Sequence, residues 1–108
     1  MPYSQPIKPT SPPINNKTPY TQKPLKVDAP ITSDMGKIPA RAKALEALGY
    51  TGLKLPELNH DPFMPLALAA ANTQKIELVT SVAVAFARNP MSMAVQTHDL
   101  NAFSQGRF

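Results

Sequence analysis

The sequence contains no cysteine, and this absence excludes several kinds of chemistry at once. A chain without thiols has no disulfides, no thiolate metal site and no cysteine nucleophile. The sequence also lacks any apolar stretch near the ~20 residues that a membrane-spanning helix needs. Its N-terminus lacks the apolar core of a secretory signal. We therefore expect a cytoplasmic protein with no membrane partner.

The short motifs that usually carry chemistry are missing too. There is no metal-ligand cluster, no glycine-rich phosphate loop and no recognisable Ser/His/Asp constellation, so we expect no bound metal. The net charge of +4 arises mainly in the first thirty residues. This segment contains four lysines (Lys8, Lys17, Lys23 and Lys26) and a single acidic residue, Asp28. Nucleic-acid binding needs a clustered basic face, so scattered lysines predict no nucleic-acid partner.

Proline is concentrated near the N-terminus, where eight of the thirteen prolines lie within the first thirty residues. Proline fixes φ and removes a backbone donor, so neither a helix nor a central strand persists there. We expect residues 1–24 to form a disordered, partly polyproline-II leader. A single domain follows over residues 25–108. The PxxP patterns at residues 6–9 and 9–12 match ligands of aromatic grooves, although composition alone produces such patterns.

Strand-like and helix-like segments alternate after the leader. Three segments read as strands: residues 25–29, residues 51–56 and the apolar run 76–90. Three segments with helical apolar spacing follow them: residues 38–48, 62–72 and 91–104. This alternation implies parallel strands with right-handed helical crossovers, in either a doubly wound sheet or a barrel.

Local signals mark where the helices start and stop. Pro39 suits the first turn of one helix, and Asp61 and Asn89 suit the caps of the next two. Gly49 and Gly106 suit the left-handed position that ends many helices. The continuous apolar character of residues 76–90 predicts a strand that is covered on both faces.

Polar residues follow the expected strands at their carboxyl ends. They are Asp28, then Glu57 with His60, then Thr80 with Ser81. Parallel strands bring these ends to one rim, where a planar redox ring could rest on hydrogen-bonding groups. From the residues alone, Glu57 could equally be a solvated loop carboxylate, and His60 could be a loop histidine or a local cap.

Four phrases over residues 45–108 carry a family resemblance: LEALGYTGL, PELNHDPFMPLALAAA, IELVTSVAVAFARNPM and DLNAFSQGRF. They resemble the N-terminal part of the luciferase-like monooxygenase family, in particular its coenzyme F420-dependent oxidoreductases. The resemblance implies a (β/α)8 barrel that binds cofactor and a small-molecule substrate at the carboxyl ends of its strands. It also implies coenzyme F420, or alternatively FMN, as the redox cofactor.

The same resemblance implies roles for particular residues. Glu57 matches the acidic residue beside the cofactor ring, and His60 belongs to the following loop, so both are catalytic candidates. Ser81 and Val82 match a bulge in the third strand where relatives carry a cis peptide behind the ring. Thr80 flanks that bulge, so Thr80, Ser81 and Val82 are the cofactor-binding candidates.

The length of the chain sets a limit on this function. A (β/α)8 barrel takes roughly 250 residues, whereas 108 residues suffice for three β/α units and the start of a fourth strand at Arg107 and Phe108. We expect four apolar side chains to face the barrel interior without partners: Val27, Leu55, Leu78 and Val82. We therefore expect a partial barrel that has no independent catalysis and that forms homo-oligomers through its open sheet edge.

A second hypothesis is a small non-catalytic interaction protein. Its proline-rich leader would be the ligand for a partner, and its β/α part would be an oligomerisation surface. A complete flavodoxin-like binding domain is disfavoured because the strand series is unfinished.

Overall fold

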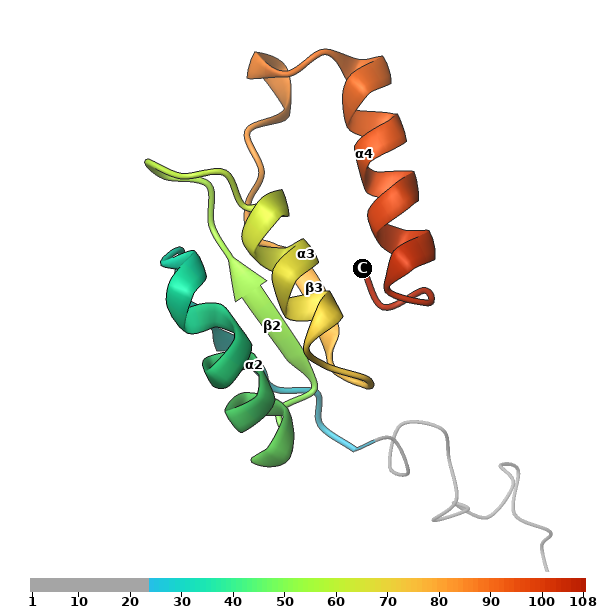
Figure 1. Cartoon of the computed structure of the whole chain (residues 1–108). Coiled ribbons are helices and arrows are strands. Elements are labelled where there is room, and N and C mark those ends of the chain that lie inside the picture. Colours follow the sequence, from blue (N-terminus) through green and yellow to red (C-terminus); the bar gives the residue numbers. More distant parts are fainter. Residues whose placement is uncertain (1–23) are drawn as a thin grey trace, which may run out of the picture.

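The computed structural model describes residues 24–108, so nearly all of the expected leader lies outside the described residues. Two β/α units and a third strand and helix follow one another along this part of the chain (Figure 1). In chain order, the elements are β1 (Asp28–Pro30), η1 (Met35–Lys37), α2 (Ile38–Ala47), β2 (Gly52–Leu55), α3 (Phe63–Ala71), β3 (Glu77–Thr80), η2 (Ala85–Ala87) and α4 (Pro90–Phe103).

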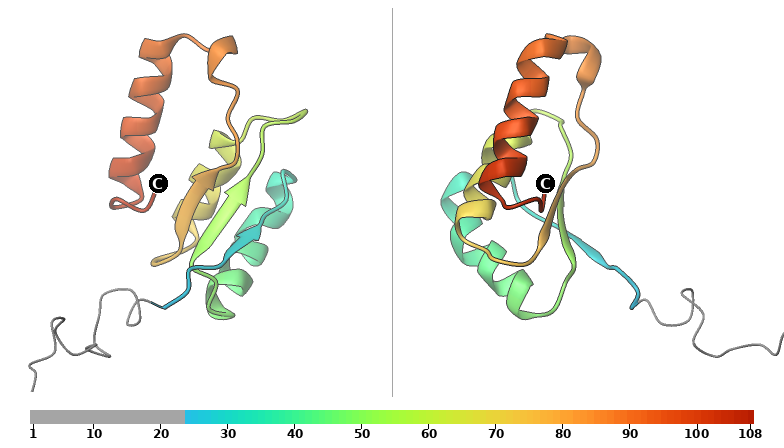
Figure 2. Two further views of the ribbon diagram at one scale, coloured as in Figure 1. Left: turned by 180° about the vertical axis from the view of Figure 1, so that it is seen from behind. Right: turned by 90° about the vertical axis from the view of Figure 1, so that its right-hand side faces the viewer.

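The strands form one parallel sheet in the order β1-β2-β3, which confirms the expected parallel pairing. Ala29, Leu53 and Leu78 lie side by side across it. Helices α2 and α3 cover one face of the sheet, and the view from behind in Figure 2 shows that the other face is open. Parallel strands in chain order, with helices α2 and α3 on one face, are consistent with successive units of a barrel.

The hydrophobic core lies between the sheet and helices α2 and α3. Leu55 and Leu78 belong to this core, so the expectation that they face a barrel interior is wrong. Their neighbours Lys54 and Val79 lie on the open face instead, because successive side chains in a strand point to opposite faces. The helices contribute six residues to this core: Ile38, Ala42, Phe63, Leu66, Ala69 and Ala70.

The first strand begins later than expected. Leu25 and Val27 are exposed and precede β1, although the Val27 backbone already bonds to Thr51 through N–H and C=O. Asp28 therefore starts β1 instead of ending it. It lies at the amino end of the strand, away from the expected rim at the carboxyl ends. Its carboxylate packs directly over Gly52, where a side chain would collide with it.

The third strand is much shorter than the apolar run that predicted it. It ends at Thr80. The Ser81 N–H still bonds to Leu55 of β2, but the backbone groups of Val82 and Val84 bond to Glu57, which lies beyond the end of β2. Val82 is 73% exposed and Phe86 is 95% exposed, so residues 81–90 are not covered on both faces. The apolar character of this run therefore reflects an exposed segment after a short strand.

The predicted helix signals are confirmed. Pro39 lies in the first turn of α2, and the side chain of Asn89 accepts hydrogen bonds from the first turn of α4. Asp61 accepts a 2.7 Å bond from the Met64 backbone at the start of α3. Helix α4 buries only Leu100 and extends beyond α3 in Figure 1. Within residues 24–108, no helix is both long enough and apolar enough to cross a membrane.

A glutamate from α2 anchors the chain just before β3. The Glu46 carboxylate accepts bonds from the backbone N–H groups of Gln74, Lys75 and Ile76 at 2.8–3.2 Å. Partial desolvation opposes ionisation, but these three bonds outweigh it and lower the pKa of Glu46. Glu46 therefore stays ionised and ties α2 to the entry of β3.

An arginine near the C-terminus closes the same end of the sheet. The Arg107 guanidinium donates to the Thr73 hydroxyl and to the carbonyls of Ala70, Thr73, Ile76 and Ser104 at 2.8–3.2 Å. Its own carbonyl accepts a 2.8 Å bond from the Leu78 backbone. That bond lies on the outer edge of β3, where the sequence predicts a fourth strand to start.

We expect Arg107→Met to lower the free energy of unfolding strongly. Hydrogen bonds to a charged group contribute about 1.5–3 kcal/mol each and are not additive, so the expected loss is about 2–4 kcal/mol. Urea unfolding followed by circular dichroism measures it. Arg41→Met, an exposed site on α2, is the matched control and should change stability by less than about 0.5 kcal/mol. Equal losses of stability in the two variants would contradict a stabilising role for the hydrogen bonds of Arg107.

Gln105 adopts a left-handed backbone conformation, with φ of 57°, in the turn after α4. A side chain there costs roughly 1–2 kcal/mol, and glycine's extra freedom in the unfolded chain offsets roughly 0.4–1 kcal/mol of the gain. We therefore expect Gln105→Gly to raise the free energy of unfolding by about 0.5–1 kcal/mol. Gln96→Gly, in the middle of α4, should lower it by a similar amount. The same urea titration checks both signs.

Candidate functional site

The carboxyl ends of β2 and β3 meet at one rim. Thr80 pairs with Leu55, and the Ser81 backbone donates a 3.0 Å bond to the Leu55 carbonyl. Beyond the strands, the Glu57 backbone donates a 3.0 Å bond to the Val82 carbonyl. The structure thus brings together Glu57 and the three predicted cofactor-binding residues.

The segment that follows β3 has exposed side chains at Ser81 and Val82. The peptide bond between Ser81 and Val82 is cis, the conformation that the family resemblance implies. The side chains of both residues are exposed, and Thr80 is half-buried. A ligand at the rim could therefore contact an apolar side chain, a hydroxyl and main-chain groups together.

His60 lies in a different part of the rim. It lines an open groove at the carboxyl ends of β1 and β2 with Pro30, Ile31, Thr32, Ser33, Leu55, Pro56, Leu58 and Asn59. Neither Glu57 nor the segment 80–82 lines this groove. The predicted site residues therefore form two groups on either side of the end of β2.

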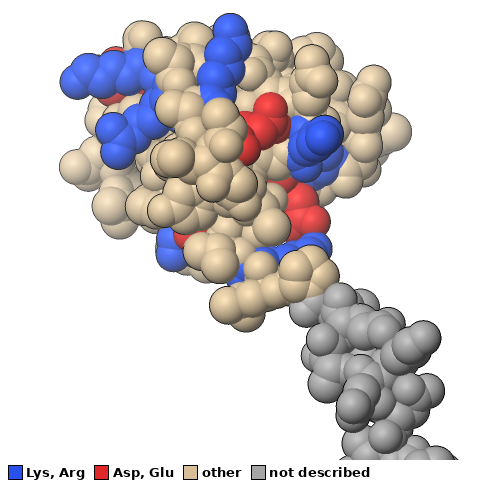
Figure 3. Space-filling view, turned by 90° about the horizontal axis from the view of Figure 1, so that it is seen from below, with Lys and Arg blue, Asp and Glu red and all other residues tan. Residues whose placement is uncertain are grey.

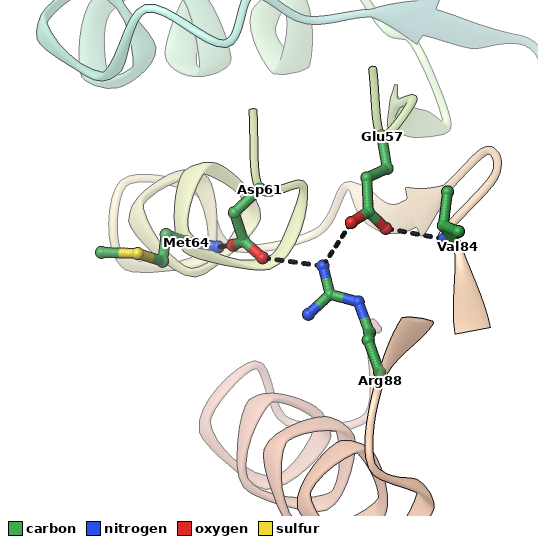
Figure 4. Close-up of polar contacts among 5 residues, drawn as sticks. All are labelled: Glu57, Asp61, Met64, Val84 and Arg88. Atoms are coloured by element: carbon green, nitrogen blue, oxygen red, sulfur yellow. Dashed lines mark hydrogen bonds and ion pairs between the residues drawn. The ribbon is translucent and has the colours of Figure 1, made fainter. Parts of the chain in front are cut away.

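Two charge-assisted hydrogen bonds hold the Glu57 carboxylate (Figure 4). One oxygen accepts a 2.6 Å bond from the Val84 backbone, and the other accepts a 2.8 Å bond from Nη2 of Arg88. The bond from Val84 lowers the pKa of Glu57, and Arg88 adds to this effect against partial desolvation and the nearby charge of Asp61. The carboxylate is thus ionised at neutral pH and directed toward the segment after β3.

Sequence reasoning missed Arg88. The same Nη2 atom donates a 3.0 Å bond to Asp61, and the guanidinium carbon lies 4.9 Å from the centroid of the Phe63 ring. The bonds to Glu57 and Asp61 raise the pKa of Arg88. A signal was present, because Arg88 is the only charged residue in residues 78–98 and a cation within an apolar run needs a partner.

The described surface shows no concentration of one charge on the face seen in Figure 3. Basic side chains are dispersed there, with acidic side chains between them. Within residues 24–108, no group of three or more His, Asp or Glu side chains is placed to hold a metal ion. The chemistry that the described site offers is hydrogen bonding and charge positioning.

A family model described as "Luciferase-like monooxygenase" matches residues 14–108. The chain belongs to the luciferase-like monooxygenase family. Uncharacterized proteins of Mycobacterium tuberculosis (strain H37Rv) and Mycobacterium bovis are each 47% identical to it over 83 residues. The aligned part is 77% of this chain and 24% of each relative, so the chain aligns with about a quarter of the relatives' length.

The match to the luciferase-like family includes both groups of rim residues. It covers Glu57 with residues 80–82 on one side of β2 and His60 on the other. It also covers Arg88 and Asp61, which the family resemblance left without a role. The ion-pair network is thus part of this chain's luciferase-like domain.

We expect the stabilising effect of Glu57 to depend on pH. The pKa of Glu57 is lowered in the folded chain from about 4.3 in the unfolded one, so its contribution is fully present above that value. The contribution is lost as the pH falls through the folded-state pKa. Glu57→Gln should therefore be less stable than the wild type at pH 7, and the gap should narrow toward pH 3. Urea unfolding at several pH values checks this, and a constant gap would contradict it.

Proposed function

We propose that this luciferase-like chain supplies the first three β/α units of a larger barrel that acts as an oxidoreductase. The redox ring of coenzyme F420, or alternatively of FMN, would rest at the rim beside Thr80, Ser81 and Val82. The substrate would be a small organic molecule that approaches the same rim. Hydride transfer is the redox step that a bound deazaflavin would supply.

The single observation behind this proposal is the convergence of the strand ends. Parallel strands in chain order, with α2 and α3 on one face, bring Glu57 and residues 80–82 to one edge. In barrels of this kind the functional residues come from the carboxyl ends of several strands. The family match supports the same reading.

The residues at the rim fit a planar ring with polar edges. Val82 offers an exposed apolar surface for a ring face. The hydroxyls of Ser81 and Thr80 and nearby main-chain groups offer hydrogen bonds to its edge. Thr32, Ser33 and Asn59 line the adjacent groove and add further polar groups.

We propose different roles for the two catalytic candidates. Glu57 is ionised and already accepts two strong bonds, so it orients the rim and does not readily donate a proton. His60 is exposed in the groove, where an imidazole can move a proton to or from a substrate. Both groups would exclude water only with the cover of further strands.

We also propose that the chain has no hydride-transfer activity alone. One face of the sheet is open, and the chain aligns with about a quarter of its relatives' length. The second candidate function is a non-catalytic oligomerising protein, favoured by exposed apolar side chains on and near α4: Phe86, Met91, Val95 and Phe103. Light scattering tests it, because a defined oligomer that binds no cofactor would support the second candidate.

A chimaera tests the proposed function. The aligned segment of the Mycobacterium tuberculosis relative is replaced by this chain's residues, and F420 and FMN are titrated separately by fluorescence. We expect F420 to bind and Val82→Asp to weaken its affinity at least tenfold, because the introduced charge would be desolvated beneath the ring. Leu48→Asp is the control, at an exposed position near the end of α2.

Each outcome of that titration has a separate meaning. Binding of FMN alone would favour the flavin alternative. If the parent relative binds a cofactor and the chimaera binds neither, the proposed rim is wrong. Equal affinities for the Val82→Asp and Leu48→Asp variants would place the ring elsewhere.

A further inference from the structure

Arg88 connects three separate segments of the rim through a single guanidinium. Its Nη2 donates to Glu57 in the loop after β2 and to Asp61 at the start of α3. Arg88 itself lies between η2 and α4, in the chain that follows β3. The three side chains are 20–31% exposed, so water screens their interaction only partly.

The two carboxylates transmit this contact to the backbone. The second oxygen of Glu57 accepts from Val84, and the Glu57 backbone donates to Val82. The second oxygen of Asp61 accepts from the Met64 backbone and caps α3. Figure 4 shows the resulting chain of contacts from Val84 through Glu57 and Arg88 to α3.

Two features indicate a specific arrangement and not a loose surface pair. The guanidinium carbon lies over the buried ring of Phe63, 4.9 Å from its centroid, within the range of a cation–π interaction. Its Nε is buried and has no partner among the described residues, a cost that the other contacts must offset. Without Arg88, the carboxylates of Glu57 and Asp61 would repel each other in a partly dry site.

We propose that Arg88 is a positioning residue for the rim. It holds Glu57 in the orientation that captures Val84, and thereby holds residues 81–84 against the loop after β2. The consequence for ring binding rests on the proposed function, whereas the positioning itself is a property of the chain alone. The Arg88 side chain bonds to Glu57 and Asp61 and to none of the proposed ring contacts at residues 80–82, so it acts through Glu57.

Amide hydrogen exchange, measured by NMR on the 108-residue chain, tests the positioning. In Arg88→Met we expect Val84 N–H to exchange at least tenfold faster, while Leu53 and Leu78 in the sheet keep their wild-type rates. The Glu57 carboxyl, followed by its ¹³C resonance, should titrate at a higher pH than in the wild type. In Arg88→Lys, the Val84 exchange rate and the Glu57 titration should lie between those of the wild type and Arg88→Met, because lysine keeps the charge without the planar fork. Arg41→Met is the control, with wild-type values throughout.

Wild-type exchange at Val84 and an unchanged Glu57 titration in Arg88→Met would overturn the proposal. If Arg88→Met also loses protection at Leu53 and Leu78, the sheet has unfolded. The exchange rate of Val84 in Arg88→Lys then tests the positioning role. Faster exchange confined to Val84 in the lysine variant supports positioning, and wild-type exchange there overturns it. In the chimaera, Arg88→Met should weaken F420 affinity at least tenfold. If the unmutated chimaera binds no cofactor, the proposed function fails, and the exchange result still decides the role of Arg88.

Discussion

The rim of this protein depends on the placement of one ionised carboxylate. Glu57 accepts bonds from the Val84 backbone and from Arg88, and its own N–H bonds to Val82. β3 ends at Thr80, and its last bond to β2 runs from the Ser81 N–H to Leu55, so the contacts of Glu57 hold the segment that follows. The geometry that a ring would meet at Ser81 and Val82 follows from them.

The same device secures the other end of β3. Glu46 binds the backbone N–H groups that precede the strand, and Arg107 binds the carbonyls that end α3 and lead into it. Orphan backbone groups at turns and helix ends must find partners. Here charged side chains from distant parts of the chain provide them, so a four-residue strand is held at both ends.

How far the sequence predicted the fold varied with the kind of signal. The order of elements, the parallel pairing and the caps at Asp61 and Asn89 were correct because they depend on local spacing and local hydrogen bonds. The start of β1 and the end of β3 were wrong. The apolar composition of a segment does not show whether another element covers that segment. Apolar residues before β1 and after β3 are in fact exposed.

The sequence by itself determined the alternation of strands and helices, the helix starts and the family, since each lies in short patterns of adjacent residues. Only the tertiary structure decided that Arg88 joins Glu57 and Asp61, which are 31 and 27 residues away along the chain. Only the tertiary structure showed that His60 lines a groove that Glu57 does not line, and that Asp28 lies away from the rim. Such pairings depend on the packing of several elements in space, which no local pattern encodes.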